Sequence, residues 1–196
     1  MLNNKFSKGV IFSCIAAIFW GLPQPLFFNE LNHVATIEVV AHRGFWSFIF
    51  LFLLLILISN ISDFIEIFKS RKRIFILTIT AFLIAGNWAG FIYSVGQERV
   101  QDASMGYFIT PMISIVLGYF FLNEKITKPK FASVCFMLSG ILFLFINLNQ
   151  FPFLIIWIGT SWAIYGLLRK QVNVNPSIGL LYETFICLLY TSPSPR

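Results

Sequence analysis

The sequence has few charged residues: only 11% of its 196 residues are Asp, Glu, Lys or Arg, whereas 58% are hydrophobic and 24 are phenylalanine. A soluble domain carries about 25% charged residues, and a soluble fold of this length has too little interior for so much apolar surface. The composition therefore excludes a soluble domain and predicts an all-α polytopic membrane protein.

Cysteine and histidine are also scarce. The three cysteines, Cys14, Cys135 and Cys187, lie in apolar runs and form no Cys-x-x-Cys pair, so we expect neither a disulfide framework nor a metal site. The two histidines, His33 and His42, belong to no His-Glu-x-x-His motif, and no serine lies in a glycine-flanked elbow. We therefore expect no enzymatic activity and no cofactor.

Apolar runs long enough to cross a bilayer occupy most of the chain. A span needs about 20 apolar residues. The sequence predicts spans near residues 9–28, 37–58, 74–95, 103–122, 131–147 and 152–168, and the start of another from about 177. The first run follows Lys5 and Lys8 and reaches Phe28 without a small-residue cleavage site, so we interpret it as a span and not as a cleaved signal.

Lysine and arginine are concentrated in alternate loops. They precede the first span and follow the second, fourth and sixth; these residues are Lys5, Lys8, Lys69, Arg71, Lys72, Arg73, Lys125, Lys128, Lys130, Arg169 and Lys170. Arg99 is the only lysine or arginine in the intervening loops. By the positive-inside rule, the N-terminus and the ends of the even-numbered spans are predicted to be cytoplasmic. This distribution explains the net charge of +6 without a nucleic-acid partner.

Between the second and third spans, apolar residues recur at helical spacing beside basic ones. Ile61, Phe64, Ile65 and Phe68 have this spacing and favour a short helix lying in the inner interface. A plain solvated loop is the alternative interpretation.

Four spans carry polar residues at a similar predicted depth. Gln24, Arg43, Asn87 and Tyr107 each fall on the outer side of their span's midpoint, about 5–8 Å above the bilayer centre. The first span also contains Pro23 and Pro25, which release two carbonyls from helical hydrogen bonds. We predict a shared polar chamber with a helix break that shapes its outer gate; a simple kink at the end of the helix is the alternative.

The second span holds three ionisable groups, which are costly in hydrocarbon unless they meet a partner or a wet cavity. Glu38, His42 and Trp46 follow a spacing of four and share a face, and Arg43 lies about 100° round the helix from His42. The functional hypothesis assigns Arg43 to an anionic or zwitterionic solute, with Glu38 and His42 as proton acceptors. The alternative is an ion-pair network that holds helices together.

In the fourth span, small and polar residues form one stripe. The stripe is Ser104, Tyr107, Pro111, Ser114 and Gly118. Close helix packing explains Ser104, Ser114 and Gly118 at least as well as a pore does. Within the stripe, we assign Tyr107 and Pro111 to the lining of the solute path. For Asn87 in the third span, a hydrogen bond to another helix competes with a role in solute binding.

These motifs resemble those of the RarD-type transporters, within the EamA-like branch of the drug/metabolite transporter superfamily. The resemblance runs from about residue 8 to 186 and rests on Trp20-Gly21…Pro23, Glu38…His42-Arg43…Trp46-Ser47, Gly86-Asn87-Trp88, Ala103-Ser-Met-Gly-Tyr107-Phe-Ile-Thr-Pro111, Leu122-Asn-Glu124-Lys125 and Tyr165-Gly166…Arg169-Lys170. The fourth-span run and the His-Arg-x-x-Trp-Ser run are its most specific parts.

The resemblance implies an inner-membrane secondary transporter with about ten helices in two inverted five-helix repeats and a central solute site. On this basis residues 1–147 are expected to form the first repeat and residues 148–186 the start of an incomplete second one. Residues 187–196, with Pro193 and Pro195, are expected to be a non-native read-through tail. Glu183, on the last helix, is a third candidate for proton coupling.

The predicted function is therefore movement of a small metabolite or drug-like solute across the bacterial plasma membrane by alternating access. The predicted partners are the solute and the lipid bilayer, and the oligomeric state, a dimer included, stays open. A non-transporting membrane scaffold or an inactive transporter fragment is the principal alternative. An intramembrane hydrolase using Ser104 or Ser114 is a third.

Overall fold

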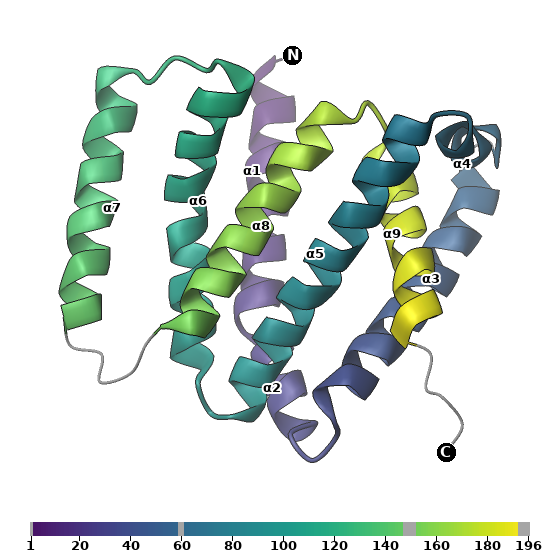
Figure 1. Cartoon of the computed structure of the whole chain (residues 1–196), viewed down its shortest axis with the longest axis horizontal. Helices are drawn as coiled ribbons and strands as arrows, with labels where there is room; N and C mark the ends of the chain where they lie inside the picture. The colour runs from purple at the N-terminus through teal and green to yellow at the C-terminus, as the bar shows by residue number, and fades with distance from the viewer. Residues whose placement is uncertain (1, 59–60, 147–151, 192–196) are drawn as a thin grey trace.

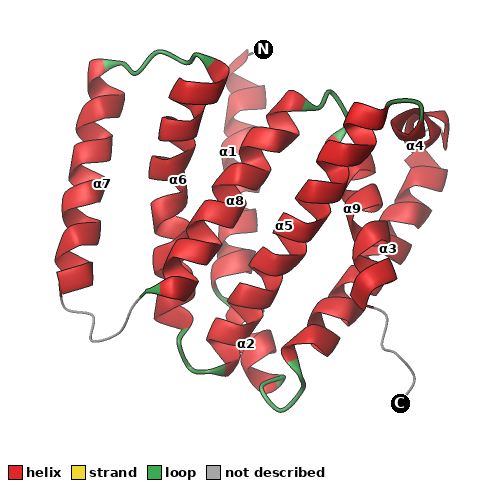
Figure 2. Ribbon diagram, viewed as in Figure 1, coloured by secondary structure: helices red, strands yellow, loops and turns green. Residues whose placement is uncertain are grey.

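The computed structural model describes residues 2–58, 61–146 and 152–191, and the regular secondary structure in these ranges is α-helical (Figure 1, Figure 2). The helices are α1 (Leu2–Gly21), α2 (Pro23–Glu30), α3 (Thr36–Ile58), α4 (Ile61–Phe68), α5 (Arg71–Gly96), α6 (Val100–Leu122), α7 (Lys128–Ile146), α8 (Phe153–Gln171) and α9 (Pro176–Thr191). The prediction of an all-α protein is confirmed for this part of the chain.

Four segments are long and apolar enough to cross a membrane: Ser7–Glu30, Thr36–Leu57, Arg71–Gly96 and Val100–Leu122. They coincide with the first four predicted spans. Helices α7 and α8 occupy the fifth and sixth predicted spans but are not among the four; each has 19 residues, and lysine or arginine lies near one end of each. Helix α9 is apolar from Pro176 to Tyr190 but shorter than a typical span.

The first candidate span is interrupted at its prolines. Helix α1 ends at Gly21 and α2 begins at Pro23, with Leu22 between them at φ −113° and ψ −69°. Pro23 and Pro25 have no backbone N–H, so the carbonyls of the preceding turn lose their helical donors there. The break lies inside the apolar segment Ser7–Glu30 and not at its end.

Local sequence also fixes other helix ends. Pro176 begins α9, where its missing N–H is not needed, and the side chain of Asn175 accepts a hydrogen bond from the Ser177 N–H at 3.0 Å. Asn123 ends α6 in the left-handed conformation, with φ 53°, which asparagine tolerates better than most residues. The segment Ile61–Phe68 is helical, as the first of the two interpretations expects, with Ile67 fully buried.

Helix α8 packs between α5 and α6, and α9 packs between α3 and α5 (Figure 1). The buried residues of α6 are Ala103, Gly106, Ile109 and Gly118. Of the polar stripe expected on this helix, Ser104, Pro111 and Ser114 are exposed. The face that α6 packs against α8 is therefore largely a different one from the stripe, which the sequence pattern alone does not distinguish.

Glycines set the distance between α6 and α8. A Cβ atom at Gly106 would lie 2.8 Å from Cβ of Ile158 and 3.1 Å from the carbonyl oxygen of Ile155, and one at Gly159 would lie 2.8 Å from the carbonyl oxygen of Gly106. We expect Gly106→Ala to reduce the free energy of unfolding by about 1–3 kcal/mol, because a methyl group forces these backbones apart. Thermal unfolding in detergent measures this effect.

Gly140→Ala in α7 is the matched control, since a Cβ atom there meets nothing within 4 Å. We expect it to leave the unfolding temperature unchanged or slightly higher, because alanine has the better helix propensity. Equal unfolding temperatures for the Gly106 and Gly140 variants would contradict the close approach of α6 to α8.

The basic segments gather at one end of the bundle. The N-terminus and the α4–α5, α6–α7 and α8–α9 connections lie at the upper end in Figure 1, whereas the α2–α3 and α5–α6 connections lie at the lower end. At the upper end, Glu124 forms ion pairs with Lys170 at 3.2 Å and Lys130 at 3.8 Å, and so joins the ends of α6, α7 and α8. The basic loops that alternate in the sequence therefore share one end in space.

Helix α9 continues beyond residue 186, where the native sequence was predicted to end. Tyr190 stacks on Phe82 with ring centroids 4.6 Å apart, and its hydroxyl donates to the carbonyl oxygen of Ala81 at 3.3 Å. Residues 192–196, which hold the rest of the predicted tail, and the predicted repeat boundary at residues 147–148 lie outside the described residues. The expected tail and the repeat boundaries stay predictions.

Candidate functional site

Arg43 lies among aromatic rings where α2, α3 and α5 meet. Its guanidinium carbon is 4.3 Å from the ring centroid of Trp88 and 5.7 Å from that of Phe28. Both rings are buried, and Arg43 itself is half-buried. Within the described residues Arg43 forms no ion pair within 4 Å. Cation–π contacts stabilise the guanidinium here by about 0.5–2 kcal/mol but do not neutralise its charge. The site therefore holds a cation, Arg43, that lies over the rings of Phe28 and Trp88 and has no ion pair among the described residues.

Further aromatic rings from α1, α5, α6 and α8 pack against one another near this site. The ring of Tyr107 lies 5.1 Å from Trp20, 6.0 Å from Phe91 and 6.3 Å from Trp162. Trp162 in turn stacks on Tyr165 at 5.2 Å. We call Trp20, Phe91, Tyr107, Trp162 and Tyr165 the aromatic cluster. Trp162 and Tyr165 on α8 therefore pack through this cluster against Tyr107 on α6.

Asn87 is fully buried and its amide is committed to protein partners. Its nitrogen donates to the Ile158 carbonyl at 2.9 Å and to the Ser161 hydroxyl at 3.0 Å, and its oxygen accepts from the Tyr107 hydroxyl at 2.8 Å. One side chain on α5 thus holds α6 and α8 and fixes the direction of the Tyr107 hydroxyl. Both amide hydrogens are used, so direct donation by Asn87 to a solute would require this network to open.

The other predicted site residues lie at more open positions. Gln24 and Pro25 are half-buried, and the remaining ones, Pro23, Glu38, His42, Trp46 and Pro111, are exposed. Glu38 is in the first turn of α3 and forms no ion pair in the part of the chain that the structure describes. Among the described residues, neither Glu38 nor Arg43 therefore forms the ion pairs that the alternative hypothesis, a network holding helices together, requires.

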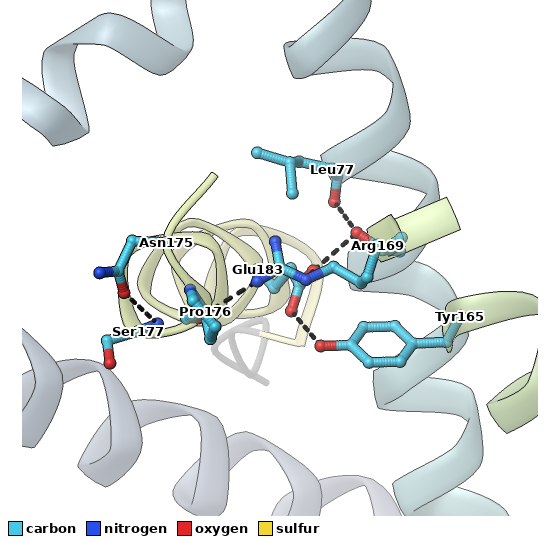
Figure 3. A network of polar contacts seen from close by, with 8 residues as sticks. Leu77, Tyr165, Arg169, Asn175, Pro176, Ser177 and Glu183 are labelled. Atoms are coloured by element: carbon cyan, nitrogen blue, oxygen red, sulfur yellow. Dashed lines mark hydrogen bonds and ion pairs between the residues drawn. The ribbon is translucent and has the colours of Figure 1, made fainter. Parts of the chain in front are cut away.

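Glu183 lies at the centre of a second polar cluster, formed by α5, α8 and α9 (Figure 3). It is 0% exposed. Its Oε1 accepts from the Thr80 hydroxyl at 2.7 Å and lies 3.7 Å from Nε of Arg169, and its Oε2 accepts from the Tyr165 hydroxyl at 3.1 Å. We call Thr80, Tyr165, Arg169 and Glu183 the ionic network. Tyr165 belongs to both groups and connects the aromatic cluster to the ionic network.

Sequence reasoning selected Glu183 but missed Thr80 and Arg169 as its partners. Thr80 has nothing in its local sequence that sets it apart, and Arg169 was counted among the basic residues of a loop. One usable signal was present: Tyr165 and Arg169 are four residues apart on α8, so both face the same neighbour. The spacing of Tyr165 and Arg169 does not indicate which helix the two side chains face.

Several apolar spans, an arginine without an ion pair inside one of the candidate spans and a buried ionic network define a multi-pass membrane protein with polar side chains between its helices. The EamA-like transporter family model matches residues 7–146. The chain therefore belongs to the EamA-like transporter family, as its motifs predicted.

The similar proteins include RarD proteins. The chain is 33% identical over 177 residues to "Protein RarD" of Escherichia coli (strain K12), covering 90% of this chain and 60% of that protein. It is 33% identical over 181 residues to an "Uncharacterized transporter" of Vibrio cholerae, covering 92% and 60%, and 30% identical over 191 residues to "Uncharacterized transporter YojE" of Bacillus subtilis, covering 96% and 64%. No solved structure matches the chain. The chain spans less than two thirds of the length of these curated relatives.

Proposed function

We propose that the chain is part of a secondary transporter of the bacterial plasma membrane that moves a small amphipathic solute with an anionic or zwitterionic group. The observation that carries this proposal is Arg43, a half-buried cation that lies over Trp88 and has no ion pair within the described residues. A membrane protein retains such a group where it meets a polar partner or a wet cavity. A solute carboxylate supplies the missing partner, and the aromatic rings contact its apolar part.

The predicted site residues take the following roles. Arg43 binds the anionic group, and Gln24, Trp46, Tyr107 and Pro111 line the solute path. Asn87 acts on the solute mainly by fixing the hydroxyl of Tyr107, since its own amide hydrogens are occupied. The break at Pro23 and Pro25 shapes the outer gate. Glu38, His42 and Glu183 are the candidates for proton coupling.

The proposed architecture is that of two inverted repeats. Residues 1–147 form the first, and residues 148–186 begin the second. Support comes from the greater length of the relatives and from the packing of α8 and α9 between helices of the first segment. The shared end of the basic connections supports a cytoplasmic N-terminus (Figure 1). No nucleic-acid partner is part of this proposal.

A non-transporting membrane scaffold is the second candidate function. The observation in its favour is that the polar side chains of Asn87 and Tyr107 bind each other and α8, as they would in a purely structural bundle. Saturable solute flux separates the two functions, because a scaffold has none.

The test uses proteoliposomes containing the longest reading frame that includes this chain. Three labelled probes share a phenyl ring and differ in charge: phenylacetate, phenylalanine and phenethylamine. We expect saturable uptake of the anion or the zwitterion and none of the amine, because Arg43 attracts a carboxylate and repels an ammonium group. Empty liposomes are the control. Uptake of all three without saturation would favour the scaffold.

A further inference from the structure

Thr80 has one hydroxyl hydrogen but two acceptors within reach. Its Oγ1 lies 3.0 Å from the carbonyl oxygen of Leu77 and 2.7 Å from Oε1 of Glu183. A threonine hydroxyl donates only once. If Glu183 is ionised, the hydrogen points at Oε1. If Glu183 carries a proton on Oε1, the acid donates to Oγ1 and the hydroxyl donates to Leu77. Both protonation states therefore have a complete set of hydrogen bonds at Thr80.

Arg169 is held close to Glu183 without closing on it. The separation of 3.7 Å between its Nε and Oε1 of Glu183 is longer than the 2.7–2.9 Å of a charge-assisted hydrogen bond. Its Nη2 donates instead to the carbonyl oxygen of Pro176 at 3.2 Å. Its Nη1 is buried and has no hydrogen-bond partner among the described residues. A movement of about 1 Å would bring the guanidinium onto the carboxylate.

Gly179 makes room for this arrangement. It lies one turn before Glu183 on α9, and a Cβ atom there would overlap Nη1 of Arg169. The guanidinium therefore lies against the backbone of α9 at Gly179, where only glycine, which has no Cβ atom, leaves space for it. The contact with Gly179 therefore helps to hold the Arg169 guanidinium beside Glu183.

The surroundings of Glu183 contain few other ionisable groups. Within the described residues, the titratable or charged groups that contact it are Tyr165 and Arg169, both from α8. Helix α5 contributes Thr80. Contacts of α3 and α4 with α9 include Gly44 beside Cys187, Phe48 against Phe185 and Phe68 against Tyr182. Tyr182 and Cys187 are the titratable side chains of α9 in these contacts.

We propose that Oε1 of Glu183 is a proton-exchange site at which a proton and the Arg169 guanidinium compete. In one state a hydronium ion transfers its proton to Oε1 and leaves as water. The acid then donates to Thr80, Thr80 donates to the Leu77 carbonyl, and Arg169 stays on the Pro176 carbonyl. In the other state the proton returns to water, Thr80 donates to Oε1 and Arg169 closes on the carboxylate. Tyr165 donates to Oε2 in both states.

The role of this exchange in proton coupling rests on the proposed transport function. In that role Arg169 is a positioning residue, because it acts through Glu183. The proposed exchange also selects among the three candidates. Glu38 and His42 are exposed, whereas Glu183 is enclosed by partners that suit both of its protonation states. The exchange moves Arg169 relative to α9, so it links protonation to the contact that the Arg169 side chain makes between α8 and α9.

Infrared spectroscopy of the reconstituted protein, recorded as the pH is varied, tests the site without any solute. We expect a protonated-carboxyl band that is lost in Glu183→Gln. In Thr80→Val, which matches threonine in shape, we expect this band to move to higher frequency because the acid has lost its acceptor. Thr80→Ser keeps the hydroxyl and should leave the band in place. Absence of a Glu183-dependent band, or a band that Thr80→Val does not move, would overturn the proposal.

A double-mutant cycle tests the role of Arg169 independently. Unfolding temperatures of Arg169→Gln, Glu183→Gln and the double variant are compared at about pH 9 and about pH 5. We expect non-additive shifts at the higher pH, where the ion pair is closed, and additive shifts at the lower pH, where the proton has replaced Arg169. Equal coupling at both pH values would refute the competition. If the spectra and the cycle succeed while solute flux is absent, the proposed transport function fails and the exchange site stands.

Discussion

Replacement of Arg43 by alanine is expected to abolish saturable uptake of the preferred phenyl probe. Breaking a buried charge-assisted contact with a solute costs about 2–5 kcal/mol, so the uptake rate at low solute concentration should fall more than about tenfold. The chain should still fold, because Arg43 contributes cation–π contacts and no ion pair within the described residues. Initial uptake rates in proteoliposomes at matched protein density measure the effect.

Two further variants sharpen this test. Arg43→Lys retains the charge but loses the planar group that lies over Trp88, so we expect partial uptake. Arg71→Ala removes an exposed arginine from the start of α5 and should leave uptake unchanged. Full uptake by Arg43→Ala in a well-folded sample would remove Arg43 from the solute site.

Replacement of Glu183 by alanine is expected to have the largest effect on stability. The substitution leaves Arg169, whose side chain is only 13% exposed, without its counter-charge. It also removes the acceptor of the Tyr165 hydroxyl and one of the two acceptors of Thr80. Breaking a buried ion pair by removing one partner costs about 3–5 kcal/mol. Unfolding in detergent, followed by circular dichroism, should show a loss of this size.

The controls separate the charge from the shape of the side chain. Glu183→Gln should cost less, since the amide oxygen still accepts from Tyr165 and the amide nitrogen can donate to Thr80, as the protonated acid would. Adding Arg169→Met to Glu183→Ala should restore part of the lost stability, because the unpaired charge is then gone. A double variant less stable than Glu183→Ala alone would show that the charge of Arg169 is not the source of the cost.

The sequence determined the class of the protein and its coarse layout, because these depend on local properties. Long apolar runs must form helices in a bilayer, where every backbone polar group needs an internal partner. The four candidate spans, the basic connections that share one end and the helix break at Pro23 and Pro25 follow from runs of a few to about 20 residues. The motifs around Arg43 and Tyr107 likewise indicated the EamA-like family.

The tertiary structure alone decided which polar side chains meet. Thr80 and Glu183 are 103 residues apart in sequence, and Asn87 and Ser161 are 74 apart, so no helical periodicity brings them together. The packed face of α6 was similarly undetermined. Gly106 and Gly118 are both buried, but a Cβ atom at Gly106 would meet Ile158 of α8, whereas one at Gly118 would meet the side chain of Glu124. Periodicity orients residues on one helix, but the contacts between helices depend on how their surfaces fit.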